Sequence, residues 1–398
     1  MELMPGYKHS DVGVIPEDWD VISIGELFTF KNGLNKEKKF FGHGTPIVNY
    51  MDVFGRSSMR IGDIAGRVDV NLKELIAYGV RKGDVFFTRT SETVDEVGVA
   101  SVMLDAPENT VFSGFVLRAR PADESLDNNF KAYCFSPSYF RQQITSRAGY
   151  TTRALTNGRY LSAALLVRPH LPEQRAIAQA LGDIDALLAA LDQTIAKKRD
   201  LKQAAMQQLL TGETRLPGFS GEWEVKFLGN ISHIKTGKRN NEDKVEAGIY
   251  PFFVRSATVE RIDTYSHECE AILVPGEGQI GSIFHYINGR FDVHQRVYAI
   301  TQFAEGVSGR FVHLYMSHRF GDWAMQNTVK ATVDSLRLPT FQSFEVRLPP
   351  TIEEQTEIAD ILTDMDTELI ALEASRDKTR NIKQAMMQEL LTGKTRLV

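Results

Sequence analysis

The sequence is poor in cysteine and lacks any segment typical of a secreted or membrane protein. Two cysteines occur in 398 residues, Cys134 and Cys269, and neither has a partner at CxxC spacing. This argues against a disulfide framework or a structural zinc site and favours a reducing cytoplasm. The first residues show no basic region followed by an apolar run, and no stretch approaches the roughly 20 apolar residues of a membrane span. We therefore expect a cytoplasmic protein without membrane contact.

The sequence also lacks the common catalytic and cofactor motifs. It contains no GxxxxGK[ST] loop and no HExxH pair, which argues against an ATP-binding loop and a protease-like zinc site. Residues 276–281 match GxGxxG, but strand and turn residues follow them instead of a helix, so a glycine-rich turn is the better interpretation. We expect no catalysis, no metal and no cofactor in this chain. The alternative is a nucleotide-dependent or nuclease enzyme whose helices serve only for dimerisation.

The main feature that the sequence does contain is an internal repeat of a long helix. Residues 173–216 align with residues 354–397 without a gap, and 24 of the 44 positions are identical. In each copy, apolar residues alternate spacings of four and three, which is the pattern of a coiled-coil seam. Gly212 and Gly393 each follow Leu-Leu-Thr, where a glycine commonly ends a helix. The repeat therefore predicts two long helices.

The repeat includes the openings of two globular segments. The matched residues are Trp19 with Trp223, Val21 with Val225, Gly25 with Gly229, Lys31 with Lys235, and Gly33 with Gly237. Between these openings and the helices the sequences diverge, with short β-branched and aromatic runs that are typical of strands. Residues 130–147 and 309–327 look like helices late in each domain. We expect an α/β fold with two globular domains whose twisted sheets are mainly antiparallel, a long antiparallel two-helix coiled coil that separates them, and an internal pseudo-two-fold repeat.

The order of these segments predicts their arrangement. Because the ends of a domain usually lie close together, the second helix should begin near the end of the first and run back along it. We expect domain 1 at residues 1–170, spacer helix 1 at 171–212, a linker at 213–222, domain 2 at 223–350, spacer helix 2 at 351–393 and a tail at 394–398.

Polar and basic residues suited to DNA occur in the loops of both domains. The net charge is −5, but no acidic residue lies between Asp127 and Glu173, where several arginines fall. Lysine and arginine neutralise phosphates, while asparagine, glutamine and arginine can read base edges. The predicted DNA-binding residues are Lys36, Lys38, Lys39, Arg89, Thr90, Ser91, Arg147, Tyr150, Thr151, Arg153, Lys238, Arg239, Asn240, Gln279, His294, Gln295, Arg296 and Lys330.

On these features the whole chain resembles the specificity subunit of Type I restriction-modification systems. The resemblance is carried by Leu-Pro-Glu-Gln at 171–174 with Glu-Glu-Gln at 353–355, and by the long helices that follow. It is also carried by the helix endings Gln-Gln-Leu-Leu-Thr-Gly at 207–212 and Gln-Glu-Leu-Leu-Thr-Gly at 388–393, and by Gly-Asp-Val-Phe-Phe-Thr-Arg at 83–89.

The resemblance implies a non-catalytic subunit that binds double-stranded DNA, with each domain reading one half of a split, asymmetric site. It implies that the helices dock two methyltransferase subunits and that restriction subunits join the assembled complex. S-adenosylmethionine and ATP are then expected in those partners, and no cofactor in this chain. The repeated polar edges of the helices would be the docking faces, with Gln174, Ile177, Asp185, Gln203, Met206, Gln355, Ile358, Asp366, Gln384 and Met387. A third hypothesis is a coiled-coil scaffold that binds only protein and has no sequence preference on DNA.

Overall fold

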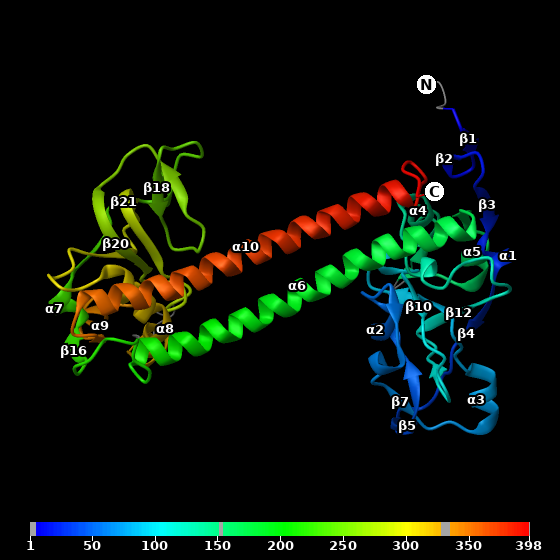
Figure 1. Cartoon of the computed structure of the whole chain (residues 1–398), viewed down its shortest axis with the longest axis horizontal. Helices are drawn as coiled ribbons and strands as arrows, with labels where there is room; N and C mark the ends of the chain where they lie inside the picture. The colour runs from blue at the N-terminus through cyan, green and yellow to red at the C-terminus, as the bar shows by residue number, and fades with distance from the viewer. Residues whose placement is uncertain (1–4, 151–153, 328–334, 398) are drawn as a thin grey trace. The chain divides into compact units, whose positions relative to one another are not determined.

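The computed structural model of the chain describes residues 5–150, 154–327 and 335–397. It divides into two compact units, which we describe separately. Unit 1 is Met1–Ala190 with Ser375–Val398, and unit 2 is Leu191–Ala374. Each unit holds one globular domain, called domain 1 or domain 2, and part of each of two long helices, α6 (Leu171–Thr211) and α10 (Ile352–Leu390) (Figure 1).

Domain 1 is built on a five-stranded sheet with the strand order β4-β12-β8-β10-β6. These strands are β4 (Phe28–Asn32), β12 (Val116–Pro121), β8 (Val85–Thr88), β10 (Ala100–Met103) and β6 (Ser58–Met59). Neighbours run antiparallel except β10 and β6, which are parallel. All four residues of β8 are buried, as expected for a run of β-branched and aromatic residues in a central strand.

Smaller strands and short helices complete domain 1. The paired strands are β1 (Tyr7–Ser10) with β2 (Gly13–Pro16), β3 (Asp20–Ser23) with β15 (Leu165–Arg168), β5 (Phe41–Val48) with both β7 (Arg67–Val68) and β11 (Val111–Phe112), and β14 (Ala154–Leu155) with both β9 (Thr90–Ser91) and β13 (Gly149–Tyr150). The helices are α1 (Ile24–Leu27), α2 (Tyr50–Val53), α3 (Leu72–Tyr78), α4 (Ser138–Thr145) and α5 (Gly158–Ser162).

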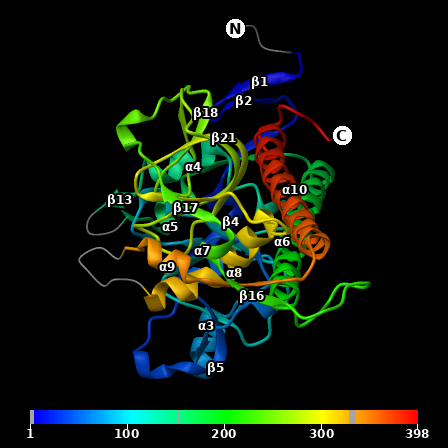
Figure 2. The same cartoon turned by 90° about the vertical axis from the view of Figure 1, so that its left-hand side faces the viewer.

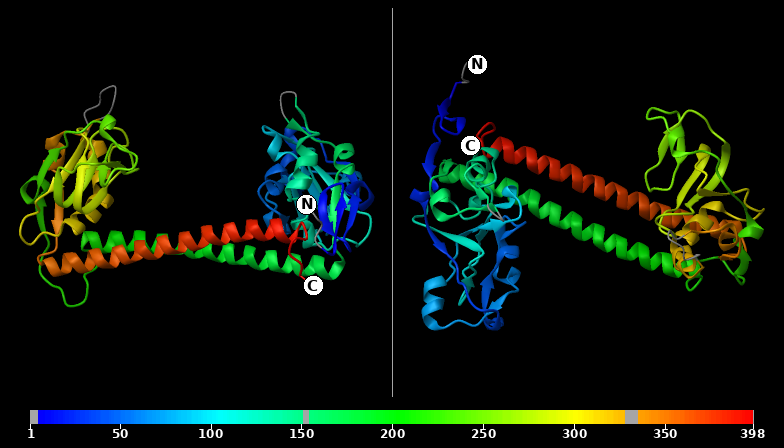
Figure 3. Two further views of the ribbon diagram at one scale, coloured as in Figure 1. Left: turned by 90° about the horizontal axis from the view of Figure 1, so that it is seen from above. Right: turned by 180° about the vertical axis from the view of Figure 1, so that it is seen from behind.

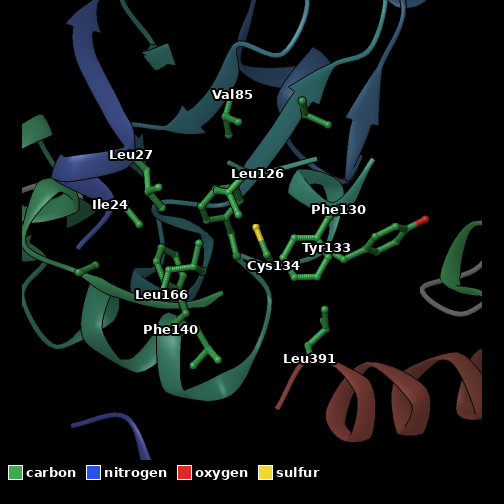
Figure 4. Close-up of a cluster of buried hydrophobic side chains, with 14 of the residues drawn as sticks. Ile24, Leu27, Val85, Leu126, Phe130, Tyr133, Cys134, Phe140, Leu166 and Leu391 are labelled. Atoms are coloured by element: carbon green, nitrogen blue, oxygen red, sulfur yellow. The ribbon is translucent and has the colours of Figure 1, made fainter. Parts of the chain in front are cut away.

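The core of unit 1 joins the sheet to both long helices. Phe130 and Phe140 are buried beside Cys134, and Leu391, directly after α10, reaches the same cluster (Figure 4). Leu181 of α6 is also fully buried there. Burying a side chain of this size stabilises a protein by about 1.5–3 kcal/mol. The start of α6 and the end of α10 are therefore parts of the domain 1 core.

Domain 2 is built on a six-stranded sheet with the order β17-β22-β20-β21-β18-β19. Its strands are β17 (His233–Thr236), β22 (Val297–Thr301), β20 (His267–Pro275), β21 (His285–Val293), β18 (Tyr250–Phe253) and β19 (Glu260–Ile262). Only β18 and β21 pair in parallel within this sheet. The mainly antiparallel α/β fold expected for both domains is thus confirmed.

A separate strand pair and three helices complete domain 2. They are β16 (Glu224–Phe227) with β23 (Glu345–Leu348), and α7 (Leu228–Ile231), α8 (Gly309–Asn327) and α9 (Leu338–Gln342) (Figure 2). Leu210 of α6 and Leu362 of α10 are buried in the same core as Phe311 of α8. The end of α6 and the start of α10 lie beside domain 2 (Figure 3). The end of α6 and the start of α10 therefore complete the core of unit 2.

The helix expected late in each domain is found intact only in domain 2. Residues 309–327 form α8, but residues 130–147 form a short 3₁₀ turn followed by α4. Pro137 stands at the N-terminal cap of α4. Because proline has no N–H, it cannot sit inside a continuous helix without breaking a hydrogen bond. The expectation of one helix over 130–147 was therefore wrong.

The repeated glycines mark equivalent close approaches in the two domains. A β-carbon on Gly33 would lie 2.0 Å from Ser113 O, and one on Gly237 would lie 1.9 Å from Val293 O. Any side chain would force the backbones apart at these two places. The glycines are therefore needed where the loop after the first sheet strand crosses the end of β11 or β21.

Buried ion pairs join the two helix ends in each unit. In unit 1, Arg396 donates to both oxygens of Glu173 (2.6 and 2.9 Å), and Trp19 Nε1 donates to the same carboxylate (2.8 Å). In unit 2, Arg215 donates to both oxygens of Glu354 (2.6 and 2.7 Å). The glutamate side chains are 3% and 0% exposed. These pairs explain why the sequence after each long helix is repeated together with the helix start.

Ion pairs also show the direction of the helices within each unit. They are Arg396 with Glu173 and Lys383 with Asp185 in unit 1, and Lys198 with Glu368, Lys202 with Asp366 and Arg215 with Glu354 in unit 2. In each unit the residue numbers rise along one helix as they fall along the other. The paired segments are therefore antiparallel.

Candidate nucleic-acid interface

In each domain a tight turn between two sheet strands is held by the same set of backbone hydrogen bonds. In domain 1 these are Val116 N to Ser113 O (3.2 Å), Gly114 N to Leu34 O (2.9 Å), Arg89 N to Phe115 O (3.2 Å) and Thr156 N to Arg89 O (3.0 Å). In domain 2 they are Val297 N to His294 O (3.0 Å), Gln295 N to Arg239 O (2.8 Å), Gly276 N to Arg296 O (2.8 Å) and Leu336 N to Gly276 O (2.8 Å). We call these turns, residues 113–116 and 294–297, the frame turns.

Each frame turn brings together the segments that the sequence singled out for DNA. The loop after the first sheet strand, the end of a central strand and the residues before α5 or α9 all hydrogen-bond to the turn or to each other. These segments are far apart in the sequence, so only the fold makes them neighbours. Thr151, Arg153 and Lys330 lie outside the described residues, and Tyr150 pairs with Ala154 in the β13–β14 ladder.

Many of the predicted DNA-binding side chains are exposed. They are Lys38, Lys39 and Arg147 in domain 1, and Lys238, Asn240, Gln279, Gln295 and Arg296 in domain 2. Thr90 is half-buried. The ion pairs that involve these residues are solvent-exposed, such as Lys39 with Glu37 (2.7 Å) and Arg296 with Glu277 (3.2 Å). Exposed ion pairs of this kind are weak, so the lysine and arginine side chains can leave their carboxylate partners and bind phosphates instead.

Two of the predicted DNA-binding side chains, His294 and Ser91, are buried in the free chain. His294 is 5% exposed, its Nδ1 accepts from Arg296 N (3.0 Å), and burial lowers its pKa. Ser91 is 7% exposed and donates to Glu96 while it accepts from Tyr50 (3.1 Å). Both side chains stabilise the loops that carry them and leave no surface for a base.

Three further predicted cations are held by intramolecular contacts. Lys36 donates to Asp69 O (2.6 Å) and pairs with Glu74 (2.7 Å). The guanidinium of Arg89 donates to Gly114 O (3.3 Å), and its Nε is buried without a hydrogen-bond partner among the described residues. Arg239 pairs with the buried Asp292 (3.2 Å) and also donates to Thr264 (2.9 Å). These contacts fix the loops around the frame turns.

Sequence reasoning missed two exposed apolar side chains beside the frame turn of domain 1. Phe115 is 62% exposed and Met51 is 69% exposed. Neither is a residue type that signals DNA binding on its own. The available signal was positional, because Phe115 lies 181 residues before Arg296 and this is the offset of the helix repeat.

Four of the predicted docking residues are buried within their own unit. Gln174 donates to Ser125 O (3.0 Å) and accepts from Asp127 N (2.8 Å), and Gln355 makes the equivalent bonds to Gly306 O and Ser308 N in unit 2. The other two are Ile177 and Ile358, each 1% exposed in its core. These side chains attach each domain to the start of a long helix and cannot contact another protein.

The remaining predicted docking residues lie on the sides of the helices. Asp185 and Asp366 pair with lysines of the facing helix, while Gln203 and Gln384 are exposed and Met206 and Met387 are half-buried. Two apolar residues next to the glutamines, Leu201 (48% exposed) and Ile382 (43% exposed), are also equivalent in the repeat. We call the helix surfaces around Leu201 and around Ile382 the paired helix faces.

The glycine-rich segment 276–281 lies between two strands, β20 and β21, and opens no helix. In the described ranges no group of three or more His, Cys, Asp or Glu side chains is arranged to hold a metal ion. No described helix has an apolar stretch long enough to cross a membrane.

Comparison with known proteins places the chain in one family. A family model described as the Type I restriction modification DNA specificity domain matches residues 16–198 and 220–383. A putative type I restriction enzyme MjaX specificity subunit from Methanocaldococcus jannaschii is 23% identical, with 98% of this chain and 97% of the relative covered. The type I restriction enzyme EcoDI specificity subunit from Escherichia coli is 28% identical over 42% of this chain and 35% of its own length.

Two solved structures share the fold. The type I restriction-modification S subunit from M. genitalium has a TM-score of 0.65 at 17% identity, with 98% of each chain covered. A chain from work on complex assembly and conformational transition of the type I R-M system has a TM-score of 0.55 at 15% identity, with 96% of this chain and 99% of that chain covered.

Proposed function

This chain belongs to the family of Type I restriction-modification specificity subunits, and we propose that each of its domains, residues 1–170 and 223–350, reads one half of a bipartite, asymmetric DNA site. In its complex the chain has a recognition role and not a catalytic one.

The observation that carries the proposal is the shared frame turn. Two domains with the same hydrogen-bonded frame can approach DNA in the same way. The residues that the turns expose differ, however, with Gly114 and Phe115 in domain 1 and Gln295 and Arg296 in domain 2. Because base edges are read by side chains, the two domains should select different bases. This difference makes the combined site asymmetric.

We propose that the paired helix faces bind two methyltransferase subunits, one at Leu201 and one at Ile382. The faces belong to different units and carry similar residues, so one partner type fits both. Restriction subunits would then join through the assembled complex. On this proposal S-adenosylmethionine and ATP are bound by the partner subunits, and the complex works in the cytoplasm.

The test is to map methylated adenines across the genome of cells that express this chain with its neighbouring methyltransferase, and of cells that express the methyltransferase alone. We expect a split, asymmetric motif only when the chain is present. The same motif in both cultures, or no motif in either, would show that the chain does not determine specificity.

A further inference from the structure

Beside the frame turn of domain 1 lies a hollow of about 300 Å³ with exposed apolar walls. Phe115 and Met51 line it and are 62% and 69% exposed, and Thr90 and Glu92 border it. Large apolar side chains that stand together in water usually mark a binding surface. The hollow is therefore a candidate contact site.

The floor of the hollow is held in place by internal contacts. The Tyr50 ring stacks on Phe54, with ring centroids 5.5 Å apart, and the Tyr50 hydroxyl donates to Ser91 (3.1 Å). Ser91 in turn donates to Glu96. The walls thus stand on a fixed floor, which is what shape-selective recognition needs.

The position of Phe115 identifies what the hollow contacts. Phe115 O accepts from Arg89 N as Arg296 O accepts from Gly276 N, so the two side chains leave equivalent points of the frame turns. Arg296 is exposed and pairs with Glu277. An exposed arginine is the common reader of guanine, and an apolar side chain at the same point is suited to a thymine methyl group.

An A·T pair matches the lining of the hollow. In the major groove this pair presents the thymine C5-methyl group, the thymine O4 acceptor and the adenine N6 amino donor. Phe115 and Met51 supply apolar contact, Thr90 a hydroxyl and Glu92 a carboxylate acceptor. A G·C pair also presents an amino donor, cytosine N4, but it lacks the methyl group that Phe115 and Met51 would contact, so the apolar walls favour A·T.

Resting on the function proposed above, we infer that this hollow takes the major-groove edge of an A·T pair, with the thymine methyl group against Phe115 and Met51 and the adenine amino group donating to Glu92. Phe115 and Met51 are then specificity-determining residues of domain 1. The carboxylate weakens general attraction to DNA while it favours an amino group, which raises selectivity.

The experiment uses the full chain in complex with its methyltransferase partner and the bipartite site found by methylation mapping. Binding is measured on duplexes in which each thymine in turn is replaced by deoxyuridine, which lacks only the methyl group. We expect one replacement to weaken binding by about three- to five-fold, the value of one buried methyl-sized group. Phe115→Ala and Met51→Ala should each abolish this difference, while Arg296→Ala retains it.

Leu72→Ala is the matched control, because Leu72 is 71% exposed on α3 of the same domain and does not line the hollow. This variant should keep the wild-type response. The inference is overturned if neither half-site contains an A·T pair, if no deoxyuridine replacement weakens binding, or if both alanine variants keep the wild-type difference. It is also overturned if Phe115→Ala weakens assembly with the methyltransferase and leaves the deoxyuridine effect unchanged. A complex with no sequence preference would instead refute the proposed function itself.

Discussion

Arg396 donates two hydrogen bonds to the carboxylate of Glu173, and the pair joins the end of the chain to the start of α6 inside unit 1. Arg396 also donates to Asp18 (2.9 and 2.8 Å), and this bond lowers the pKa of the Asp18 carboxyl. The guanidinium lies over the Trp19 ring, 5.5 Å from its centroid. Arg396 therefore joins the end of the chain to the start of α6 and to the residues just before β3.

Arg396→Ala should destabilise unit 1 strongly. The change leaves the carboxylate of Glu173 buried without its ion partner, and breaking a buried pair from one side costs about 3–5 kcal/mol. Urea unfolding of the full chain measures this loss. Arg290→Ala is the control, since Arg290 and Glu268 form an exposed pair (48% and 56% exposed) that contributes at most about 1 kcal/mol. Equal losses in the two variants would contradict the structural role of Arg396.

The stability of unit 2 should fall below pH 6.5 in part through the half-buried His313. Burial lowers the pKa of His313 from its ordinary 6.5, and this is the main cause of the change. Because the folded-state pKa is the lower one, the neutral ring is fully compatible with folding above pH 6.5, and stability is lost as the pH falls from 6.5 through the folded pKa. In urea unfolding, His313→Gln should reduce the loss of stability between pH 7 and pH 5, because glutamine does not take up a proton in this range. If the stability of His313→Gln depends on pH as the wild-type stability does, protonation of His313 is not the cause of the loss.

The long helices could be predicted because their apolar spacing is local, and the repeat showed the same pattern twice. The hydrogen bond between Glu173 and Arg396 could not be predicted, because Arg396 lies 223 residues away and only the fold brings the two together. Repetition alone also did not separate inner from outer positions. Gln174 and Ile177 repeat because they attach a domain to its helix, whereas Gln203 repeats on the surface.

The sequence could predict which segments form the candidate interface, but not which side chains within them are exposed. Basic loops after the first sheet strand indicated segments that the fold brings to the frame turns, but residue type did not reveal which side chains the fold buries, as with His294. Phe115 was overlooked because an isolated phenylalanine is more often part of a core. Its proposed role rests on the frame turn, where backbone hydrogen bonds give Phe115 the position in domain 1 that Arg296 has in domain 2.

Arg296→Ala and Lys238→Ala should have different effects on DNA recognition, although both side chains are exposed in domain 2. Loss of a base-reading arginine removes about 1–3 kcal/mol of discrimination at one base pair, so the methylation motif should become degenerate at one position of one half-site. Loss of a phosphate contact should weaken all sequences alike and reduce the salt slope of binding by about 1. Methylation mapping and binding at several salt concentrations separate the two. If both variants leave the methylation motif unchanged, Arg296 does not read a base.

Leu201→Asp and Ile382→Asp should each remove one of two methyltransferase subunits. A charge placed within an apolar contact must be desolvated on binding, and loss of such a contact costs roughly 2 kcal/mol or more, about 30-fold in affinity. Native mass spectrometry of the reconstituted complex counts the bound subunits, and the double variant should bind none. Leu187→Asp is the control, because Leu187 is equally exposed (48%) on α6 but its repeat equivalent is Glu368, so this position is not shared by the paired helix faces. If Leu187→Asp displaces a subunit while Leu201→Asp does not, the docking face lies on another side of the helices.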